Sequence, residues 1–431
     1  MLGGFRWIGL LGFAAIFGIA YAMSNNRKRI NWRLVISGLL IQLGMAIFVL
    51  KIEFGRELFK TIGDGITQLL HFSDEGAGFV FGPLVKKPEV LVQVFGPGSD
   101  YIFAFRVVPT IIFVSSLVSI SYYLGIMQRV VQIVARVVSM LMGASGGEAL
   151  SNAASVFVGQ VEAQLLIKPY VPSMTMSELL ASMAGSMACV AGGVLAVYIG
   201  FGIKASYLLT ASIMAAPGAL VISKIVYPET EESKTKGKVS IEVKSTNANI
   251  IDAAAHGASD GLRIGLNVVA MLISFTALIA MCNFVVSHVS LALYQQGMRL
   301  DTVGIDLSHF ELKDVFGLFF APVAWLLGVP WADAHTVGRL MGEKIALNEF
   351  FAYLDLSNLM KGPTPISHQA ETIATFALCG FANLSSIAIQ VGGIGEIAPS
   401  RRQDLAKLGV KALICGTMAS YLSATLAGLL T

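Results

Sequence analysis

Charged residues are scarce in this chain. Asp, Glu, Lys and Arg make up 13% of its 431 residues, roughly half of the 25% or so that is usual in soluble globular proteins. So few charges cannot cover the surface of a soluble protein of this length. Disorder is also excluded, because disordered chains combine low hydrophobicity with high charge, whereas 55% of these residues are hydrophobic. The composition predicts a polytopic membrane protein.

Cysteine and net charge are low as well. The four Cys lie inside apolar runs without the spacing of metal ligands, which excludes a disulfide-rich secreted module and a zinc site. The net charge of +3 is too small to indicate a nucleic-acid partner. No cofactor is expected from this composition.

Long hydrophobic runs, in contrast, are abundant. A helix needs about 20 largely apolar residues to cross a bilayer. About eight segments meet this requirement, which predicts eight transmembrane helices at 5–23, 34–50, 102–126, 179–201, 205–226, 264–287, 372–398 and 405–430. The first of them ends in a sequence that resembles a signal-peptide cleavage site. Cleavage would leave the basic cluster 27–33 outside, against the preference of basic residues for the cytoplasm, so we keep it as a span.

Basic residues set the expected orientation. With the cluster 27–33 in the cytoplasm, the amino terminus is outside, and alternation of the spans places Arg129, Arg136 and the loop 228–249 inside. Residues 52–70 carry apolar side chains at helical spacing with charged residues between them. This pattern predicts an amphipathic helix, either along the membrane surface or packed on other parts of the protein.

Two segments do not fit as simple spans. Residues 127–176 and 313–360 are too apolar for loops and too interrupted for single helices, and their apolar parts contain Glu162 and Glu349. A charge at bilayer depth is unfavourable by about 2.5–3.5 kcal/mol, so it normally faces a cavity or a partner. Non-helical backbone at that depth must also line a cavity or be buried in protein. We therefore predict two re-entrant hairpins with polar tips.

Glu349 also has a simpler interpretation. It lies close enough in sequence to pair with Lys344 or Arg339 on an adjacent turn. Arg339 and Glu343 are themselves four residues apart, the spacing of an ordinary ion pair on a helix surface.

The elements that follow the two hairpins have the same order. After the first hairpin comes a span interrupted by small residues at 189–193, and after the second comes a span interrupted at 380–386; another span follows each. The expected orientation makes the first hairpin enter from the cytoplasm and the second from outside, which is an inverted repeat. Interrupted helices at matching positions in two halves indicate a transporter with a binding site at the bilayer midplane.

The polar residues at these positions indicate the kind of ligand. The amides of Gln160 and Asn383 are donors and acceptors, and the carboxylates of Glu162 and Glu349 are strong acceptors. Phe381 adds a flat apolar face. Such a set suits a neutral, polyhydroxylated ligand with an aromatic heterocycle, and it would reject analogues that lack a hydroxyl group.

These residues lie in longer strings, and there the sequence resembles the concentrative nucleoside transporter family. The strings are GQVEA at 159–163, LNEFFAY at 347–353 and CGFANLSS at 379–386. The resemblance implies an all-α fold of eight transmembrane helices, two re-entrant helical hairpins in an inverted repeat and an interfacial amphipathic helix. It also implies a homotrimer in the lipid bilayer of a bacterial inner membrane, without enzymatic activity.

The resemblance implies a division of the chain as well. Residues 1–126 would form a scaffold, joined by the connector and sixth span at 228–292. Residues 127–227 and 293–431 would form the two repeats of a transport domain that moves like an elevator.

Roles for individual residues follow from the same resemblance. The substrate would be a nucleoside of the uridine, cytidine or adenosine type. The nucleobase would face Gln160, Val161 and Glu162, with Val194 beside it, while Phe381 packs against the ligand and the ribose is hydrogen-bonded by Glu349, Asn383 and Ser386. Val161 departs from the Thr or Ser that is frequent in the family, so one base contact is lost.

The sodium site of the family is incomplete in this sequence, which bears on the choice of coupling ion. The family uses one Asn side chain, one Ser hydroxyl and two backbone carbonyls. The matching positions here are Ser155, Cys189, Val158 and Val190. A thiol is a poor ligand for a hard cation, so we favour the proton over sodium, with Glu162 and Glu349 as proton carriers and sodium symport as the alternative.

Two other classes of function compete with transport. An intramembrane enzyme would use Glu162 and Glu349 as an acid–base pair, but it would need a nucleophile or a metal in addition. A passive channel would need no gated site at the midplane. The inverted repeat predicts such a site and therefore argues against a channel.

Overall fold

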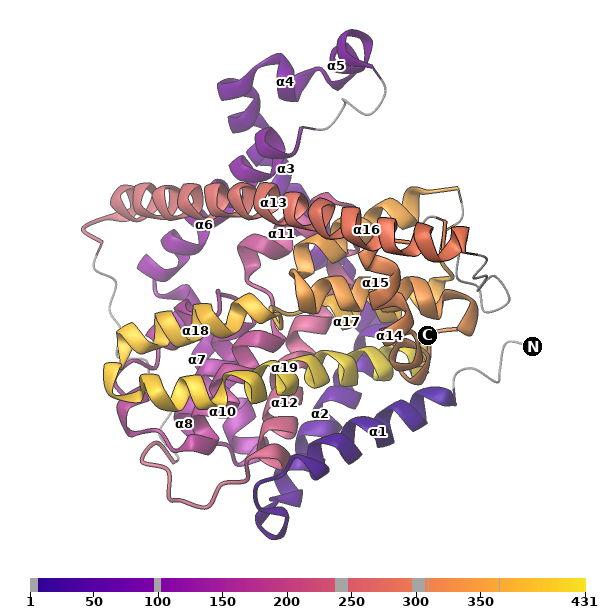
Figure 1. Ribbon diagram of the computed structural model, residues 1–431. Helices are drawn as coiled ribbons and strands as arrows, with labels where there is room; N and C mark the ends of the chain where they lie inside the picture. The colour runs from indigo at the N-terminus through magenta and orange to yellow at the C-terminus, as the bar shows by residue number, and fades with distance from the viewer. Residues whose placement is uncertain (1–6, 97–101, 237–246, 297–306, 309, 364) are drawn as a thin grey trace.

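All the regular secondary structure that the structure describes is helical. The computed structural model describes residues 7–96, 102–236, 247–296, 307–308, 310–363 and 365–431. The helices, in chain order, are α1 (Ile8–Ala22), η1 (Arg27–Arg29), α2 (Trp32–Leu50), α3 (Glu53–Phe81), α4 (Pro83–Lys86), α5 (Pro88–Phe95), α6 (Phe103–Tyr123), α7 (Ile126–Met142), α8 (Gly146–Ser155), α9 (Glu162–Leu165), η2 (Val171–Ser173), α10 (Met176–Ala188), α11 (Gly192–Gly200), α12 (Ala205–Val226), α13 (Ile250–Gln295), α14 (Leu312–Leu326), α15 (Trp331–Ala346), α16 (Glu349–Lys361), α17 (His368–Leu378), α18 (Leu384–Ile397), η4 (Pro399–Arg401) and α19 (Arg402–Leu430) (Figure 1). The predicted all-α class is confirmed.

Long apolar helices dominate the molecule. Within the described residues, six helices are long and apolar enough to cross a membrane: α2, α6, the broken helix α10–α11, α12, α13 and α19. The bent pair α14–α15 passes the same test as a seventh span. The two other predicted spans correspond to α1, which has 15 residues, and to the broken pair α17–α18.

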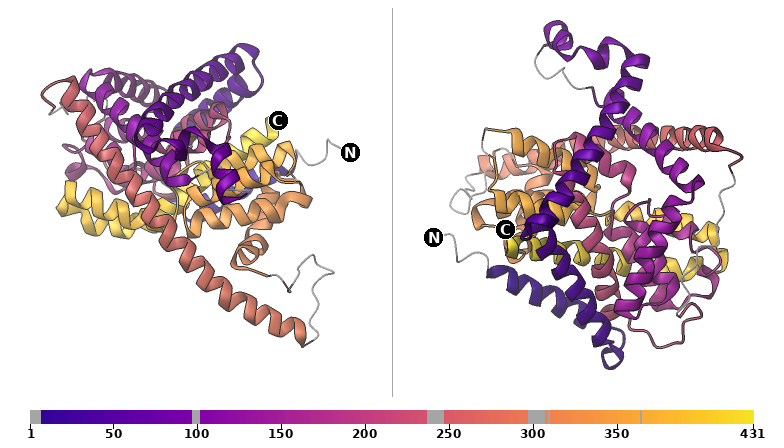
Figure 2. Two further views of the ribbon diagram at one scale, coloured as in Figure 1. Left: turned by 90° about the horizontal axis from the view of Figure 1, so that it is seen from above. Right: turned by 180° about the vertical axis from the view of Figure 1, so that it is seen from behind.

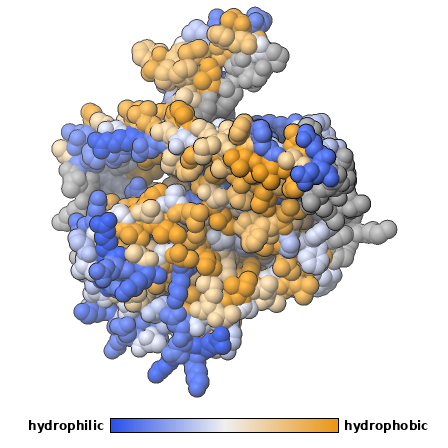
Figure 3. Space-filling model, in the orientation of Figure 1, coloured by the Kyte–Doolittle hydropathy of each residue, from blue (hydrophilic) through white to orange (hydrophobic). Residues whose placement is uncertain are grey.

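Apolar side chains also cover much of the surface. Figure 3 shows a broad hydrophobic band across the face of the molecule, with hydrophilic residues gathered at its left and lower margins. Large apolar side chains stand exposed along α13, among them Ile273, Met281 and Phe284. An apolar surface of this extent fits the hydrocarbon core of a bilayer and not water.

α13 is a single helix of 46 residues that crosses the whole molecule (Figure 2). It packs on α6 through Gly257, Gly261 and Gly265, which repeat every four residues and are buried. A Cβ atom at Gly257 would lie 2.6 Å from the Ser115 carbonyl oxygen, and one at Gly265 would lie 2.8 Å from Val108. Small residues at this spacing let two helix backbones approach closely, as in other membrane helix pairs.

The hairpin segments are shorter than the sequence predicts. α7 is an amphipathic helix of its own, with Val131, Ala135 and Val138 buried on one face and Arg129 and Arg136 exposed. The first hairpin therefore begins at α8, not at residue 127. In the second region α14 is a separate helix, bent by 119° from α15, and the hairpin consists of α15 and α16. The chain turns between them at Leu347–Asn348, directly before Glu349.

The predicted amphipathic helix at 52–70 continues further along the chain. α3 has 29 residues, and with α4 and α5 it projects from the helical body (Figure 1). At Gly63, α3 packs against Ala205 at the start of α12, where an added Cβ would lie 3.0 Å from the alanine Cβ. Near its other end Phe79 is 90% exposed. α3 is thus packed on α12 at one end, and at the other end Phe81 contacts Phe105 of α6 while Phe79 is exposed.

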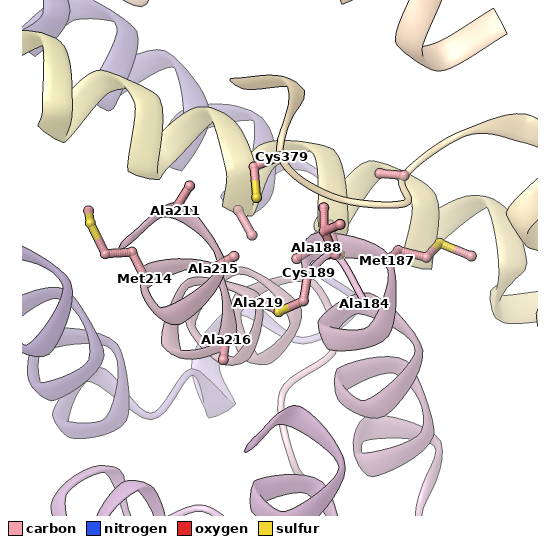
Figure 4. Close-up of a cluster of buried hydrophobic side chains, with 14 of the residues drawn as sticks. Ala184, Met187, Ala188, Cys189, Ala211, Met214, Ala215, Ala216, Ala219 and Cys379 are labelled. Carbon is pink, nitrogen blue, oxygen red and sulfur yellow. The ribbon is translucent and has the colours of Figure 1, made fainter. Parts of the chain in front are cut away.

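The two broken helices meet at their breaks. The Phe381 amide between α17 and α18 donates to the Cys189 carbonyl between α10 and α11 at 3.2 Å. Figure 4 shows Cys189 and Cys379 among buried alanines and methionines of α10 and α12. Gly380 has φ +130°, and a Cβ there would lie 2.5 Å from the Ala188 carbonyl oxygen. Only glycine fits this position, because it tolerates positive φ and adds no side chain to the contact.

Replacing Gly380 with Ala should therefore destabilise the protein. Strained backbone costs on the order of 1–3 kcal/mol, and the overlap with Ala188 adds to it. Thermal unfolding of the detergent-solubilised protein measures the change.

Gly193→Ala is the matched control. Gly193 lies at the start of α11 beside the other break, and no atom lies within 4 Å of a Cβ added there. An unchanged unfolding temperature for Gly380→Ala would contradict the assignment of strain to this break.

Candidate functional site

Two adjoining cavities lie at the meeting point of the helix breaks and hairpin tips. The larger has a volume of 680 Å³ and the smaller 140 Å³. Gln160, Val194, Phe381 and Ile389 line both. All eight residues predicted for the substrate line at least one of them: Gln160, Val161, Glu162, Val194, Glu349, Phe381, Asn383 and Ser386.

Glu349 is the acidic group of the smaller cavity. It is the first residue of α16, and a carboxylate is favourable at a helix N-terminus. Its Oε1 accepts from the Tyr198 hydroxyl at 3.0 Å and its Oε2 from Asn383 Nδ2 at 3.1 Å. The alternative pairing of Glu349 with Lys344 is wrong, because Lys344 Nζ donates to the Ala377 carbonyl at 2.8 Å.

Asn383 has its orientation fixed by its position as the N-cap of α18. Its Oδ1 accepts from the Ser386 amide at 3.0 Å and from the Ser385 hydroxyl at 2.7 Å. An N-cap uses the side-chain oxygen, so the amide nitrogen is left to point at Glu349. The Asn383 side chain thus has two roles: its oxygen caps α18 and its nitrogen holds Glu349 in the smaller cavity.

Gln160 connects the first hairpin to the second half of the chain. Its Nε2 donates to Ser386 Oγ at 3.3 Å, and its Oε1 accepts from Gln390 Nε2 at the same distance. Gln390 also donates to the Met183 carbonyl of α10. The polar wall of the cavities is therefore built from both repeats.

Glu162 differs from Glu349 in its surroundings. It is exposed to the larger cavity, whereas Glu349 is 5% exposed. The Glu162 carboxylate lies over Gly159, where an added Cβ would overlap it and displace the side chain. The neighbouring Val161 packs close to Gly393 of α18, where an added Cβ would lie 2.7 Å from its methyl groups.

The four positions matched to the family's sodium site are buried around the first helix break: Ser155, Val158, Cys189 and Val190. Ser155 Oγ donates to the Ser151 carbonyl at 2.8 Å and lies 3.0 Å from Ser186 Oγ. The Cys189 thiol points to the Ser212 carbonyl at 3.5 Å. Both side chains already have protein partners. In the part of the chain that the structure describes, no three His, Cys, Asp or Glu residues gather as metal ligands.

Sequence reasoning missed two residues of the polar wall, Tyr198 and Gln390. Each lies four residues after a predicted site residue, Val194 and Ser386 respectively. Residues four apart share one face of a helix, so this spacing was the available indication. Without that spacing, the sequence does not distinguish a polar residue that lines a site from one that only packs between helices.

Three family models of nucleoside transport and recognition match successive parts of the chain. A family model described as the C-terminus of the Na+ dependent nucleoside transporter matches residues 207–428, and the model of its N-terminus matches residues 11–84. A third model, described as nucleoside recognition, matches residues 104–205.

Similar proteins and structures extend this agreement. The chain is 42% identical to an uncharacterized transporter of Haemophilus influenzae, over 97% of this chain and 96% of that protein. It is 38% identical to the nucleoside permease NupC of Helicobacter pylori, over 97% and 96%. For the sodium/nucleoside cotransporter 2 of Rattus norvegicus the identity is 39%, over 98% of this chain and 62% of that protein.

The solved structure of CNTnw in an inward-facing substrate-bound state is 40% identical, with a TM-score of 0.90 over 99% of this chain and 98% of that one. A variant of CNTnw in an outward-facing state has a TM-score of 0.91 at 40% identity, over 99% of both chains. Identity at this level along almost the whole length, together with the shared fold, shows that this protein is a transporter, not an enzyme, and belongs to the concentrative nucleoside transporter family.

Proposed function

We propose that this protein imports nucleosides across a bacterial inner membrane by symport with a cation, and that the cation is the proton. The observation that carries the proposal is a polar wall of side chains linked by hydrogen bonds in the order Tyr198, Glu349, Asn383, Ser386 and Gln160. This wall joins both repeats at the point where the helices are interrupted. Its groups suit hydroxyl and amide partners on a neutral ligand.

The residues of the polar wall support separate binding positions for the ribose and the nucleobase, one at each end of the two cavities. Glu349 and Asn383 lie in the smaller cavity and would bind the ribose hydroxyls. Phe381 and Val194 line both cavities and would cover the apolar face of the ligand. The base would then extend toward Glu162. Uridine, cytidine and adenosine are the candidate substrates, in keeping with the nucleoside permease and cotransporter names of the relatives.

The residues at the positions of the family's sodium site favour proton coupling. Ser155 Oγ is already engaged by Ser151 and Ser186, and Cys189 offers sulfur where a hard cation prefers oxygen. Glu162 and Glu349 would carry the proton. The description of the family as Na+ dependent supports the sodium alternative, in which Val158 and Val190 supply carbonyl ligands.

An elevator-type motion is supported by the position of the larger cavity. One side of it is formed by Ile111 and Ser115 of α6 with His256 of α13, and the other by the first hairpin tip. We assign residues 1–126 and 228–292 to the scaffold. The repeats 127–227 and 293–431 would move together, because Gln160 and Cys189 of the first repeat are hydrogen-bonded to the second. The solved relatives in inward- and outward-facing states fit such a cycle.

The exposed apolar side chains of α13 and of the α3–α5 projection support a homotrimer in the bilayer. Phe95 at the end of α5 is 69% exposed and Phe284 of α13 is 65% exposed. Burial of such rings between copies of the chain, or in lipid, is favourable. We place the amino terminus outside, as the basic cluster requires.

Glu349→Gln and Asn383→Ala should each lower nucleoside uptake. A buried group that loses its partner costs about 1–3 kcal/mol, which corresponds to roughly a 5- to 150-fold lower affinity. Uptake of radiolabelled uridine and adenosine into proteoliposomes measures the effect.

The matched controls for these variants are Glu75→Gln and Asn25→Ala, two exposed positions of the same chemistry. Wild-type uptake rates in both site variants would show that the substrate binds elsewhere.

Uptake by the wild-type protein should follow an imposed inward proton gradient and not a sodium gradient. Replacing Ser155 with Asn and Cys189 with Ser returns two oxygen ligands to the first helix break, so this double variant should gain stimulation by sodium. The measurement is proteoliposome uptake with each gradient imposed alone. Cys189→Ser by itself is the milder control, and wild-type uptake driven only by sodium would refute the proton assignment.

A further inference from the structure

The second hairpin contains a pair of carboxyl groups that the substrate site does not use. Glu343 lies on α15, six residues before Glu349, and Asp355 lies on α16, six residues after it. The two side chains face each other between the arms of the hairpin. With Thr336, Arg339 and others they line a cavity of 280 Å³ that is separate from the cavities of the substrate site.

Glu343 has no conventional partner in the described part of the chain. It is 7% exposed, and its Oε2 is buried without a hydrogen-bond donor. The expected ion pair with Arg339 is wrong, because the ion pair formed by Arg339 is with Asp314, at 3.9 Å between Nη1 and Oδ1. Another carboxyl group, that of Asp355, interacts with Glu343 across the hairpin and lines the same cavity.

The charges that face Glu343 come from three helices of the described chain. They are Asp355 of α16, Arg339 of α15 and Lys313 of α14. Lys313 pairs with Glu311 at 2.8 Å and Arg339 with Asp314. The two cations thus face four carboxyl groups, those of Glu311, Asp314, Glu343 and Asp355, and cannot neutralise all of them in ionised form, although Arg339 Nε is buried without a hydrogen-bond partner.

A buried carboxylate oxygen without a donor is costly, and two carboxylates in contact cannot both be ionised. A single proton between them removes both problems, since it gives the unsatisfied oxygen a donor and the pair one charge. We propose that Glu343 and Asp355 form a proton-binding site that holds one shared proton and joins the two arms of the second hairpin. The proton comes from the aqueous phase through the 280 Å³ cavity and returns to it, without any covalent change.

The consequence for transport rests on the proposed function. Loss of the proton leaves two like charges between α15 and α16, so the arms of the hairpin separate. Acid pH on the cavity side favours the joined hairpin, and higher pH favours the separated one. The site therefore makes the hairpin that carries Glu349 sensitive to pH, independently of the titration of Glu349 itself.

The direct test is infrared difference spectroscopy of the purified full-length protein at neutral pH. The wild type should show the carbonyl band of a protonated carboxyl group, and this band should be absent in both Glu343→Gln and Asp355→Asn, because either change removes the shared pair. Glu396→Gln, which removes an exposed carboxylate of α18, should leave the band in place. Exchange of sodium chloride for choline chloride should not alter it.

If neither variant lost any carbonyl band, the proposal would be overturned, whereas a band that stays in both variants belongs to another carboxyl group such as Glu349. Loss of the pair's band in sodium would show that the pair binds sodium instead. Uptake at varied external pH gives the functional readout: Glu343→Gln should lose part of the rise with acid that the wild type shows, at unchanged affinity for the nucleoside, while the part due to proton coupling through the substrate site remains. If the wild type imported no nucleoside at all, the proposed function would fail while the spectroscopic result would still decide the proton site.

Discussion

The structure depends on the contact between two interrupted helices. Unwound backbone is tolerated at bilayer depth only where its polar groups find partners in protein. Here the breaks satisfy each other, because the Phe381 amide donates to the Cys189 carbonyl. Two further backbone groups find partners on α12 and α19, where Ser212 Oγ accepts from the Val190 amide and Ser420 Oγ donates to the Cys379 carbonyl. The small side chains around this contact allow such close approach.

This contact also positions the candidate site. The N-termini of α11 and α18 begin directly after the breaks, and each hairpin tip ends beside them. Asn383 starts α18 and at the same time holds Glu349, while Gln160 reaches across from the other repeat. The two halves are not equivalent in chemistry. The acid of the second tip is buried and doubly hydrogen-bonded, whereas that of the first, Glu162, stands on the wall of the larger cavity.

Much of this arrangement could be predicted from the sequence. The spans follow from the length of the apolar runs, and the hairpin tips follow from Glu162 and Glu349, because a carboxylate inside an apolar run must face a cavity or a partner. The start of the first hairpin was predicted too early, since α7 is apolar enough to resemble part of it. The predicted pairings of Arg339 with Glu343 and of Glu349 with Lys344 failed. Spacing along a helix indicates which side chains can meet, but neighbouring helices offered each of them another partner.

The sequence by itself determined the membrane class and the repeated order of hairpin and broken helix, and the family resemblance supplied eight of the residues that line the cavities. Only the tertiary structure decided their partners. Tyr198 meets Glu349 across 151 residues of chain, and Gln390 meets Gln160 across 230. The carboxyl pair of Glu343 and Asp355 likewise exists only because α15 and α16 fold against each other. Periodicity in the sequence shows which face of a helix is apolar. Which side chain lies opposite a given residue depends on how helices that are distant in the sequence pack together.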